Sequence, residues 1–161
     1  MNSVLVDTSF LICLSGTSRA HHELAKEYFQ RFIGAGVMMH LSTIVISEFE
    51  VRQRITDLGL NNFMILPFNI DHAVVTARIF DAMFAARQEG DARVAIKDDA
   101  KLIGQCVAAG ISHFITDDAS CAGRLNSLRS KGSTAGLPHP IDLHDGFWEG
   151  WFNEDNQGRL L

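Results

Sequence analysis

The sequence has few cysteines and prolines, no long apolar run and no strong excess of charge. Its three cysteines, Cys13, Cys106 and Cys121, are an odd number without the spacing of metal ligands, which predicts reduced thiols in a cytosol. No apolar stretch approaches the roughly 18 to 20 residues that cross a bilayer, so we expect no membrane-spanning segment. The first residues lack a basic segment followed by a long apolar stretch, so we expect a cytoplasmic protein without a secretory signal.

The composition is typical of a compact globular protein with a single domain over residues 1–161. Apolar residues make up 47% of the chain and charged residues 20%, and only three prolines interrupt it, which argues against disorder. A chain of this length buries roughly two thirds of its unfolded surface. The formal net charge of -5 is modest, so any binding of nucleic acid depends on where the basic residues lie.

Short apolar strands alternate with helical patterns along the chain. We expect strands at 3–7, 37–41, 63–68 and 113–117, and helices starting near residues 7, 20, 43, 69 and 98. Many Gly, Ser, Arg and Lys residues between 121 and 137 predict a loop or a loosely packed turn. The alternation predicts an α/β domain whose central sheet is mainly parallel and flanked by helices. Right-handed crossovers then bring the carboxyl ends of several strands to one edge of the sheet, where such folds place their sites.

Acidic residues recur at the ends of the expected strands and beside apolar runs. They are Asp7, Glu48, Asp98, Asp99, Asp117 and Asp118. Gathering many carboxylates beside a core is unfavourable through desolvation and mutual repulsion, and either protonation or a bound divalent cation relieves it. Oxygen ligands suit Mg²⁺ or Mn²⁺ and leave positions for a substrate phosphate.

Each of these acids also has a purely structural interpretation. Asp7 and Asp99 are plausible helix N-caps, the pair at 117–118 is suited to a turn, and Glu48 to a solvated helix. Capping does not explain why Glu48 lies among apolar residues at the start of a helix that follows a strand. The joint pattern therefore favours a shared site.

Four fragments in order carry a resemblance to a known family. They are VLVDTSFLI at the start, STIVISEFE near residue 45, DDAKLIGQCVAAGI in the centre and FITDDAS after it, and together they span roughly residues 1–121. The chain resembles the PIN domains, and among them most the single-domain toxin nucleases of bacterial toxin–antitoxin pairs. The resemblance implies a three-layer sandwich with acidic residues at one edge of the sheet that bind Mg²⁺ or Mn²⁺ and cut RNA.

The resemblance also implies roles for individual residues. Asp7, Asp99 and Asp118 are expected to bind the metal ion, and with Glu48 they form the expected catalytic set. Ser9, Asp98, Thr116 and Asp117 are expected to orient these carboxylates or to tune their charge. Phosphate contacts depend on Lys and Arg, and the candidates are Arg52, Lys97, Lys101, Arg124, Arg129 and Lys131, each of which alternatively serves only solubility.

The resemblance therefore implies a metal-dependent endoribonuclease, with the toxin of a toxin–antitoxin pair as its expected role and an antitoxin and a second copy of the chain as its expected partners. Two alternatives stay open: an RNA-processing nuclease that is not a toxin, and a PIN-fold module that binds RNA or protein without cutting. Trp148, Trp151 and Phe152 belong either to a packed tail or to an exposed patch for a partner. The histidines, among them His21 and His144, have no ligand spacing and are expected on helices and loops rather than on a metal.

Overall fold

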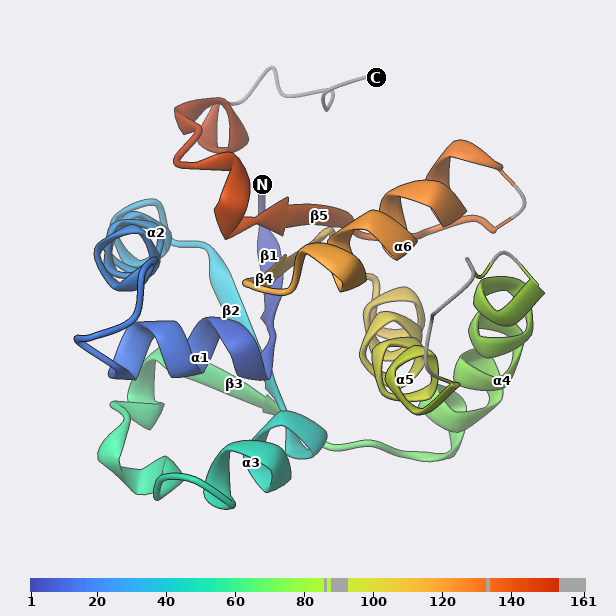
Figure 1. The fold of residues 1–161 in the computed structure, drawn as a ribbon, viewed down its shortest axis with the longest axis horizontal. Helices are drawn as coiled ribbons and strands as arrows, with labels where there is room; N and C mark the ends of the chain where they lie inside the picture. The colour runs from blue at the N-terminus through green and yellow to red at the C-terminus, as the bar shows by residue number, and fades with distance from the viewer. Residues whose placement is uncertain (86, 88–92, 133, 154–161) are drawn as a thin grey trace.

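The computed structural model has a central sheet of five parallel strands in the order β3-β2-β1-β4-β5 (Figure 1). It describes residues 1–85, 87, 93–132 and 134–153. The strands are β1 (Ser3–Val6), β2 (Met38–Ser42), β3 (Phe63–Leu66), β4 (His113–Thr116) and β5 (His139–Asp142). The structure thereby confirms the predicted α/β class, and the pairing of the described strands is parallel throughout.

Helices cover both faces of the sheet. Figure 1 shows α1 (Thr8–Ser15) and α2 (His22–Gly34) on one side of the strands, and α5 (Arg93–Ala109) and α6 (Ala119–Ser130) on the other. Helix α4 (Ile70–Ala85) packs mainly on α5, and α3 (Thr43–Glu50) follows the end of β2 and contacts α1. Within the described ranges, no helix combines the length and the apolar character that a membrane span requires.

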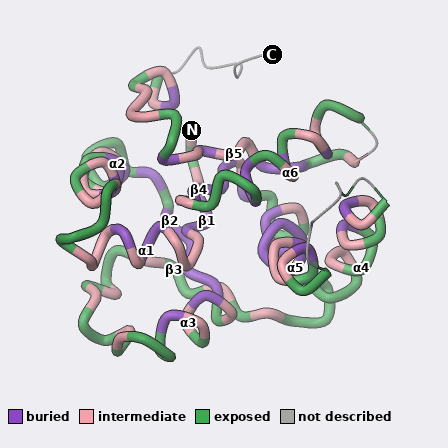
Figure 2. The backbone as a smooth tube through the Cα atoms, in the orientation of Figure 1, coloured by how far each residue is buried: buried purple, intermediate pink, exposed green. Residues whose placement is uncertain are grey.

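The apolar strands form the core because helices shield both faces of the sheet. Val4, Leu5 and Val6 of the central strand β1 are fully buried, and all of β4 is buried. Continuous burial of this kind is typical of parallel sheets between helix layers. In Figure 2 the buried segments gather on the strands and on the helix faces that contact them. The edge strand β3 is more exposed, at Met64 and Ile65.

The extents of two helices correct the sequence prediction. Helix α5 begins at Arg93 rather than at Asp98 and Asp99, so Asp99 lies well inside the helix and is not its N-cap. The buried stripe starts one turn earlier than the acidic pair, with Ile96 fully buried. The stretch 121–137, predicted as a loop, is helical as far as Ser130. The reason is a buried row at helical spacing, Cys121, Leu125 and Leu128, which the many polar residues of this stretch concealed.

The C-terminal segment contributes a strand that was not predicted and a packed aromatic cluster. Strand β5 pairs with β4 at the edge of the sheet, where Pro140 is tolerated. Trp151 is buried, and the Tyr28 hydroxyl of α2 donates a 3.0 Å hydrogen bond to the Gly146 carbonyl. The described part of the tail is therefore packed, whereas residues 154–161 of the predicted tail lie outside the described residues.

Helices α4 and α5 approach each other closely at Gly104. A Cβ atom at this position would lie 2.4 Å from Thr76 Oγ1 and 2.8 Å from Thr76 Cα. We expect Gly104→Ala to lower the free energy of unfolding by about 1–2 kcal/mol, because overpacking against backbone outweighs the better helix propensity of alanine. Urea unfolding measures the change.

A matched control is Gly123→Ala on the exposed face of α6. No atom beyond its neighbours in the chain and the backbone of its own helix lies within 4 Å of a Cβ at Gly123, so alanine there is expected to stabilise by about 0.5–1 kcal/mol. A Gly104→Ala chain as stable as the unmodified protein would contradict the close approach of the two helices.

Candidate active site

The strand order reverses between β1 and β4, and candidate carboxylates follow the carboxyl ends of both strands. From β1 the sheet extends through β2 and β3 in one direction and through β4 and β5 in the other. Val6 is in register with Ile115, and the Asp7 N–H donates to the Ile115 carbonyl at 3.0 Å. Open parallel sheets bind ligands in the crevice at such a reversal. Asp7 and the pair Asp117 and Asp118 therefore lie where this fold class places its sites.

Asp7 caps α1 and accepts three hydrogen bonds. Its Oδ1 accepts from the Thr8 N–H at 2.7 Å, and its Oδ2 accepts from the hydroxyls of Ser9 at 2.6 Å and Thr116 at 2.7 Å. Burial raises the pKa of Asp7 despite these bonds, and the charge of Asp118 raises it further. An adjacent cation would therefore stabilise the ionised form of Asp7 strongly.

Glu48 on α3 belongs to the same electrostatic group. The Thr8 hydroxyl donates to Glu48 Oε2, which joins the start of α1 to α3. Burial raises the pKa of Glu48, the charges of Asp7 and Asp98 add to the rise, and Lys101 opposes it. Thr8 is a contact that sequence reasoning missed, although its place directly after Asp7 at a helix start was visible.

Asp99 faces α6 from inside α5 and forms an ion pair there. Arg124 donates to Asp99 Oδ2 from Nε at 2.8 Å and from Nη2 at 2.6 Å, and the two side chains are only 12% and 15% exposed, arginine first. Burial raises the pKa of Asp99 to about 6, although Arg124 opposes the rise. Sequence reasoning missed this pair because it took the segment of Arg124 for a loop.

The side chains of Asp117 and Asp118 contact different parts of the structure. Asp118 caps α6, accepting from the Ser120 N–H at 2.8 Å and the Cys121 N–H at 3.1 Å. Its charge raises the pKa of both Asp7 and Asp99, so Asp118 couples Asp99 to the pair of Asp7 and Glu48. The Asp117 carboxylate makes its contacts elsewhere, with Cys13 and His21. Asp7, Glu48, Asp99 and Asp118 thus form one interacting set, which we call the carboxylate set.

The remaining predicted residues fall into two groups. Ser9 and Thr116 support the carboxylate set directly, since Ser9 Oγ also accepts the Asp117 N–H at 2.8 Å and Thr116 Oγ1 the Asp118 N–H at 3.0 Å. Among the basic candidates, Arg129 donates to the carbonyls of Leu137 and Pro138, whereas Arg52 and Lys131 are exposed beyond the ends of α3 and α6. RNA binding by the basic residues stays a prediction.

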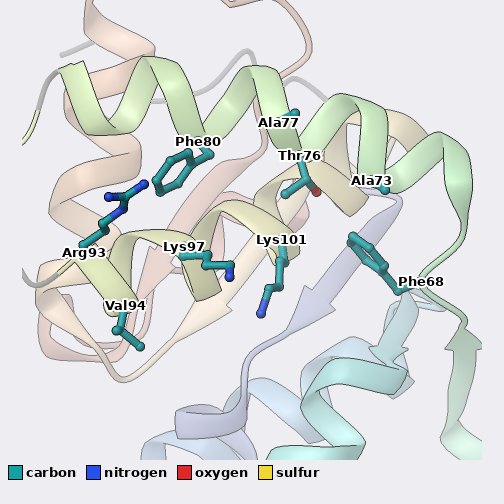
Figure 3. A pocket seen from close by; sticks show the side chains of 9 residues that line it. All are labelled: Phe68, Ala73, Thr76, Ala77, Phe80, Arg93, Val94, Lys97 and Lys101. Carbon is teal, nitrogen blue, oxygen red and sulfur yellow. The ribbon is translucent and has the colours of Figure 1, made fainter.

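A cavity of about 560 Å³ lies between α4 and α5 (Figure 3). Its apolar wall includes Phe68 and Phe80, and its basic lining comprises Arg93, Lys97 and Lys101. Lys101 also forms a 2.8 Å ion pair with Asp98, and its charge reaches Glu48. Lys101 therefore lines the cavity and also acts electrostatically on Glu48 of the carboxylate set.

Similar solved structures come from bacterial complexes. The crystal structure of FitAcB from Neisseria gonorrhoeae matches with a TM-score of 0.62 at 15% identity, covering 86% of this chain and 96% of that chain. VapBC2 from Rickettsia felis, bound to a DNA fragment from its promoter, matches with a TM-score of 0.56 at 11% identity, covering 87% and 99%. DNA-bound VapBC from Salmonella typhimurium matches with a TM-score of 0.53 at 15% identity, covering 88% and 98%.

These neighbours are toxin–antitoxin complexes whose toxins are PIN domains. At 11% to 15% identity the similarity shows a shared fold. No protein-family model and no curated protein matches the sequence. The expected fold is thereby confirmed, and what the site does has to be argued from its residues.

Proposed function

We propose that this chain, which has the fold of the PIN domains, is a divalent-metal-dependent endoribonuclease that hydrolyses RNA phosphodiester bonds. The observation that supports the proposal most is the convergence of Asp7, Glu48, Asp99 and Asp118 at the reversal of the strand order. Mutual repulsion and burial make this arrangement costly for a scaffold. Groups arranged in this way are typical of catalytic sites.

The donor set fits Mg²⁺ or Mn²⁺. Asp7, Asp99 and Asp118 offer only carboxylate oxygens, which these hard cations prefer. Asp7 Oδ2 is already oriented by two hydroxyl groups, so little reorganisation is needed to present the carboxylate. When bound, the ion supplies Lewis-acid stabilisation of the charge that develops on the phosphodiester.

The chain's own residues supply proton transfer and substrate binding. Glu48, held by the Thr8 hydroxyl and with its pKa raised by burial, acts as the general base that takes a proton from the attacking water. Lys97 and Lys101 hold RNA phosphates beside the carboxylate set, since both line the adjacent cavity. Asp98 positions Lys101 through their ion pair.

The biological role that we propose is that of the toxin in a cytoplasmic toxin–antitoxin pair. The support is the similarity in fold to components of VapBC and FitAcB. An antitoxin protein and a second copy of the chain are then the expected partners.

The test is cleavage of total cellular RNA by the untagged chain with Mg²⁺, Mn²⁺ or EDTA, compared with Asp99→Asn. We expect cutting that requires the metal and is lost in the variant, and full cutting by the control Asp81→Asn, which removes an exposed charge on α4. RNA binding without cutting under any metal would instead favour a PIN-fold binding module, and cutting in EDTA would contradict the metal requirement.

A further inference from the structure

Two histidines and an aspartate from distant parts of the chain meet beside the carboxylate set. His21 directly precedes α2, Asp117 follows β4, and His144 lies in the short turn η3 (Leu143–Asp145) after β5. One ligand atom from each side chain can be chosen so that all three atoms lie within 4.8 Å of one another. His21 Nδ1 is 2.5 Å and His144 Nδ1 is 4.0 Å from the same oxygen, Asp117 Oδ1.

Neighbouring groups hold this cluster in a defined orientation. The Cys13 thiol donates to Asp117 Oδ2 at 2.9 Å, so the other oxygen, Oδ1, faces the imidazoles. Asp142 Oδ1 accepts from the His144 N–H at 2.9 Å and lies 2.8 Å from His144 Nδ1, which orients that ring. With Nδ1 of His144 held by Asp142, Nε2 is the nitrogen that this ring offers to an ion, and a carboxylate on the other ring nitrogen is the usual outer partner of a metal-ligating histidine.

We propose that His21, Asp117 and His144 form a second metal site, which binds a borderline transition-metal cation of the Zn²⁺ class. Two imidazole nitrogens and one carboxylate oxygen are a donor set that suits Zn²⁺, whereas Mg²⁺ and Mn²⁺ prefer oxygen ligands. The three side chains are 28%, 23% and 46% exposed in chain order, so an ion reaches them from solvent and keeps an open coordination position.

The site has a structural consequence for the catalytic edge. The ion links the start of α2 to the end of β4 and the turn η3, which the pairing of Thr116 with Asp142 already holds side by side. Asp117 is adjacent to Asp118 of the carboxylate set, and its N–H donates to Ser9. Occupancy therefore stabilises the segment that carries Asp118, and thermal stability rises with Zn²⁺.

The test is calorimetric titration of the untagged full chain with Zn²⁺, with Asp99→Asn in all variants so that the carboxylate set competes less. We expect one Zn²⁺ per chain, an affinity that an excess of Mg²⁺ leaves unchanged, and a loss of at least about tenfold on adding either His21→Ala or His144→Ala. His22→Ala is the matched control, because its ring contacts the Cys13 carbonyl rather than Asp117.

Circular dichroism establishes that each variant is folded, and the melting temperature with and without Zn²⁺ is a second measurement. The chain with Asp99→Asn is expected to gain thermal stability from Zn²⁺, and the chains that also lack His21 or His144 are not. Zn²⁺ affinity that is unchanged in both histidine variants, or displaced by Mg²⁺, would overturn the assignment and leave the proposed nuclease activity untouched.

Discussion

Replacing Asp7 by asparagine is expected to abolish RNA cleavage. Asp7 is the member of the carboxylate set that the surrounding residues orient most fully, with three donors directed at its two oxygens. Loss of its charge removes an oxygen ligand of the ion that stabilises the reacting phosphodiester. We expect kcat/KM to fall by at least about a thousandfold, which corresponds to several kcal/mol of transition-state stabilisation.

The same variant is expected to fold normally. The asparagine side-chain oxygen still accepts from the Thr8 N–H and caps α1, and the Ser9 and Thr116 hydroxyls can turn to accept from the new amide. Burial disfavours the ionised form of Asp7, so a neutral residue of the same shape costs little. Cleavage assays and urea unfolding together separate the two effects, with Asp81→Asn on α4 as the control for loss of one negative charge. Cleavage by Asp7→Asn at half the normal rate or more would contradict the role of this carboxylate.

The candidate site residues could be predicted where a carboxylate lies next to a segment with a strong apolar pattern. Asp7 directly follows the buried residues of β1, and Asp118 lies two residues after the end of β4. The parallel alternation of strands and helices alone therefore brings them to one edge of the sheet. Glu48 was found because an acid among apolar residues at a helix start is unusual. These placements needed only the fold class and the period of each segment, whereas the choice of Asp118 over Asp117 came from the resemblance to the PIN domains.

What the sequence could not reveal are contacts between segments whose local pattern is weak. The ion pair of Asp99 and Arg124 depends on α6, whose polar face concealed its buried row. The cluster of His21, Asp117 and His144 depends on strand β5, which brings the turn that follows it next to β4. Each of these residues is polar and unremarkable in its own segment, and only the register of the sheet brings them together.

The stability of the metal-free chain is expected to fall as the pH rises from about 4 to about 6. Burial raises the pKa of Asp99 from 3.8 to about 6, so between these values the folded chain holds a proton that the unfolded chain has released. The stabilisation is present in full below the unfolded pKa and is lost as the pH rises through the folded pKa. For Asp99 alone this amounts to about 2 kcal/mol between pH 4.5 and pH 7. Asp7 and Glu48, whose pKa values are also raised, act in the same direction.

Urea unfolding in EDTA across this pH range isolates the contribution of Asp99 by comparison with Asp99→Asn. The variant loses the titrating group, so the difference in unfolding free energy between the unmodified chain and the variant should shrink by about 2 kcal/mol from pH 4.5 to pH 7. The constant cost of leaving Arg124 without this partner shifts the variant at every pH and does not change the slope. Asp81→Asn, which removes an exposed charge on α4, should keep the slope of the unmodified chain. Because a divalent cation binds only the ionised carboxylates, Mg²⁺ should restore stability above pH 6 in the unmodified chain and much less in Asp99→Asn. Parallel pH profiles of the unmodified chain and Asp99→Asn would contradict the raised pKa of Asp99 and, with it, the electrostatic reason for a cation at this edge of the sheet.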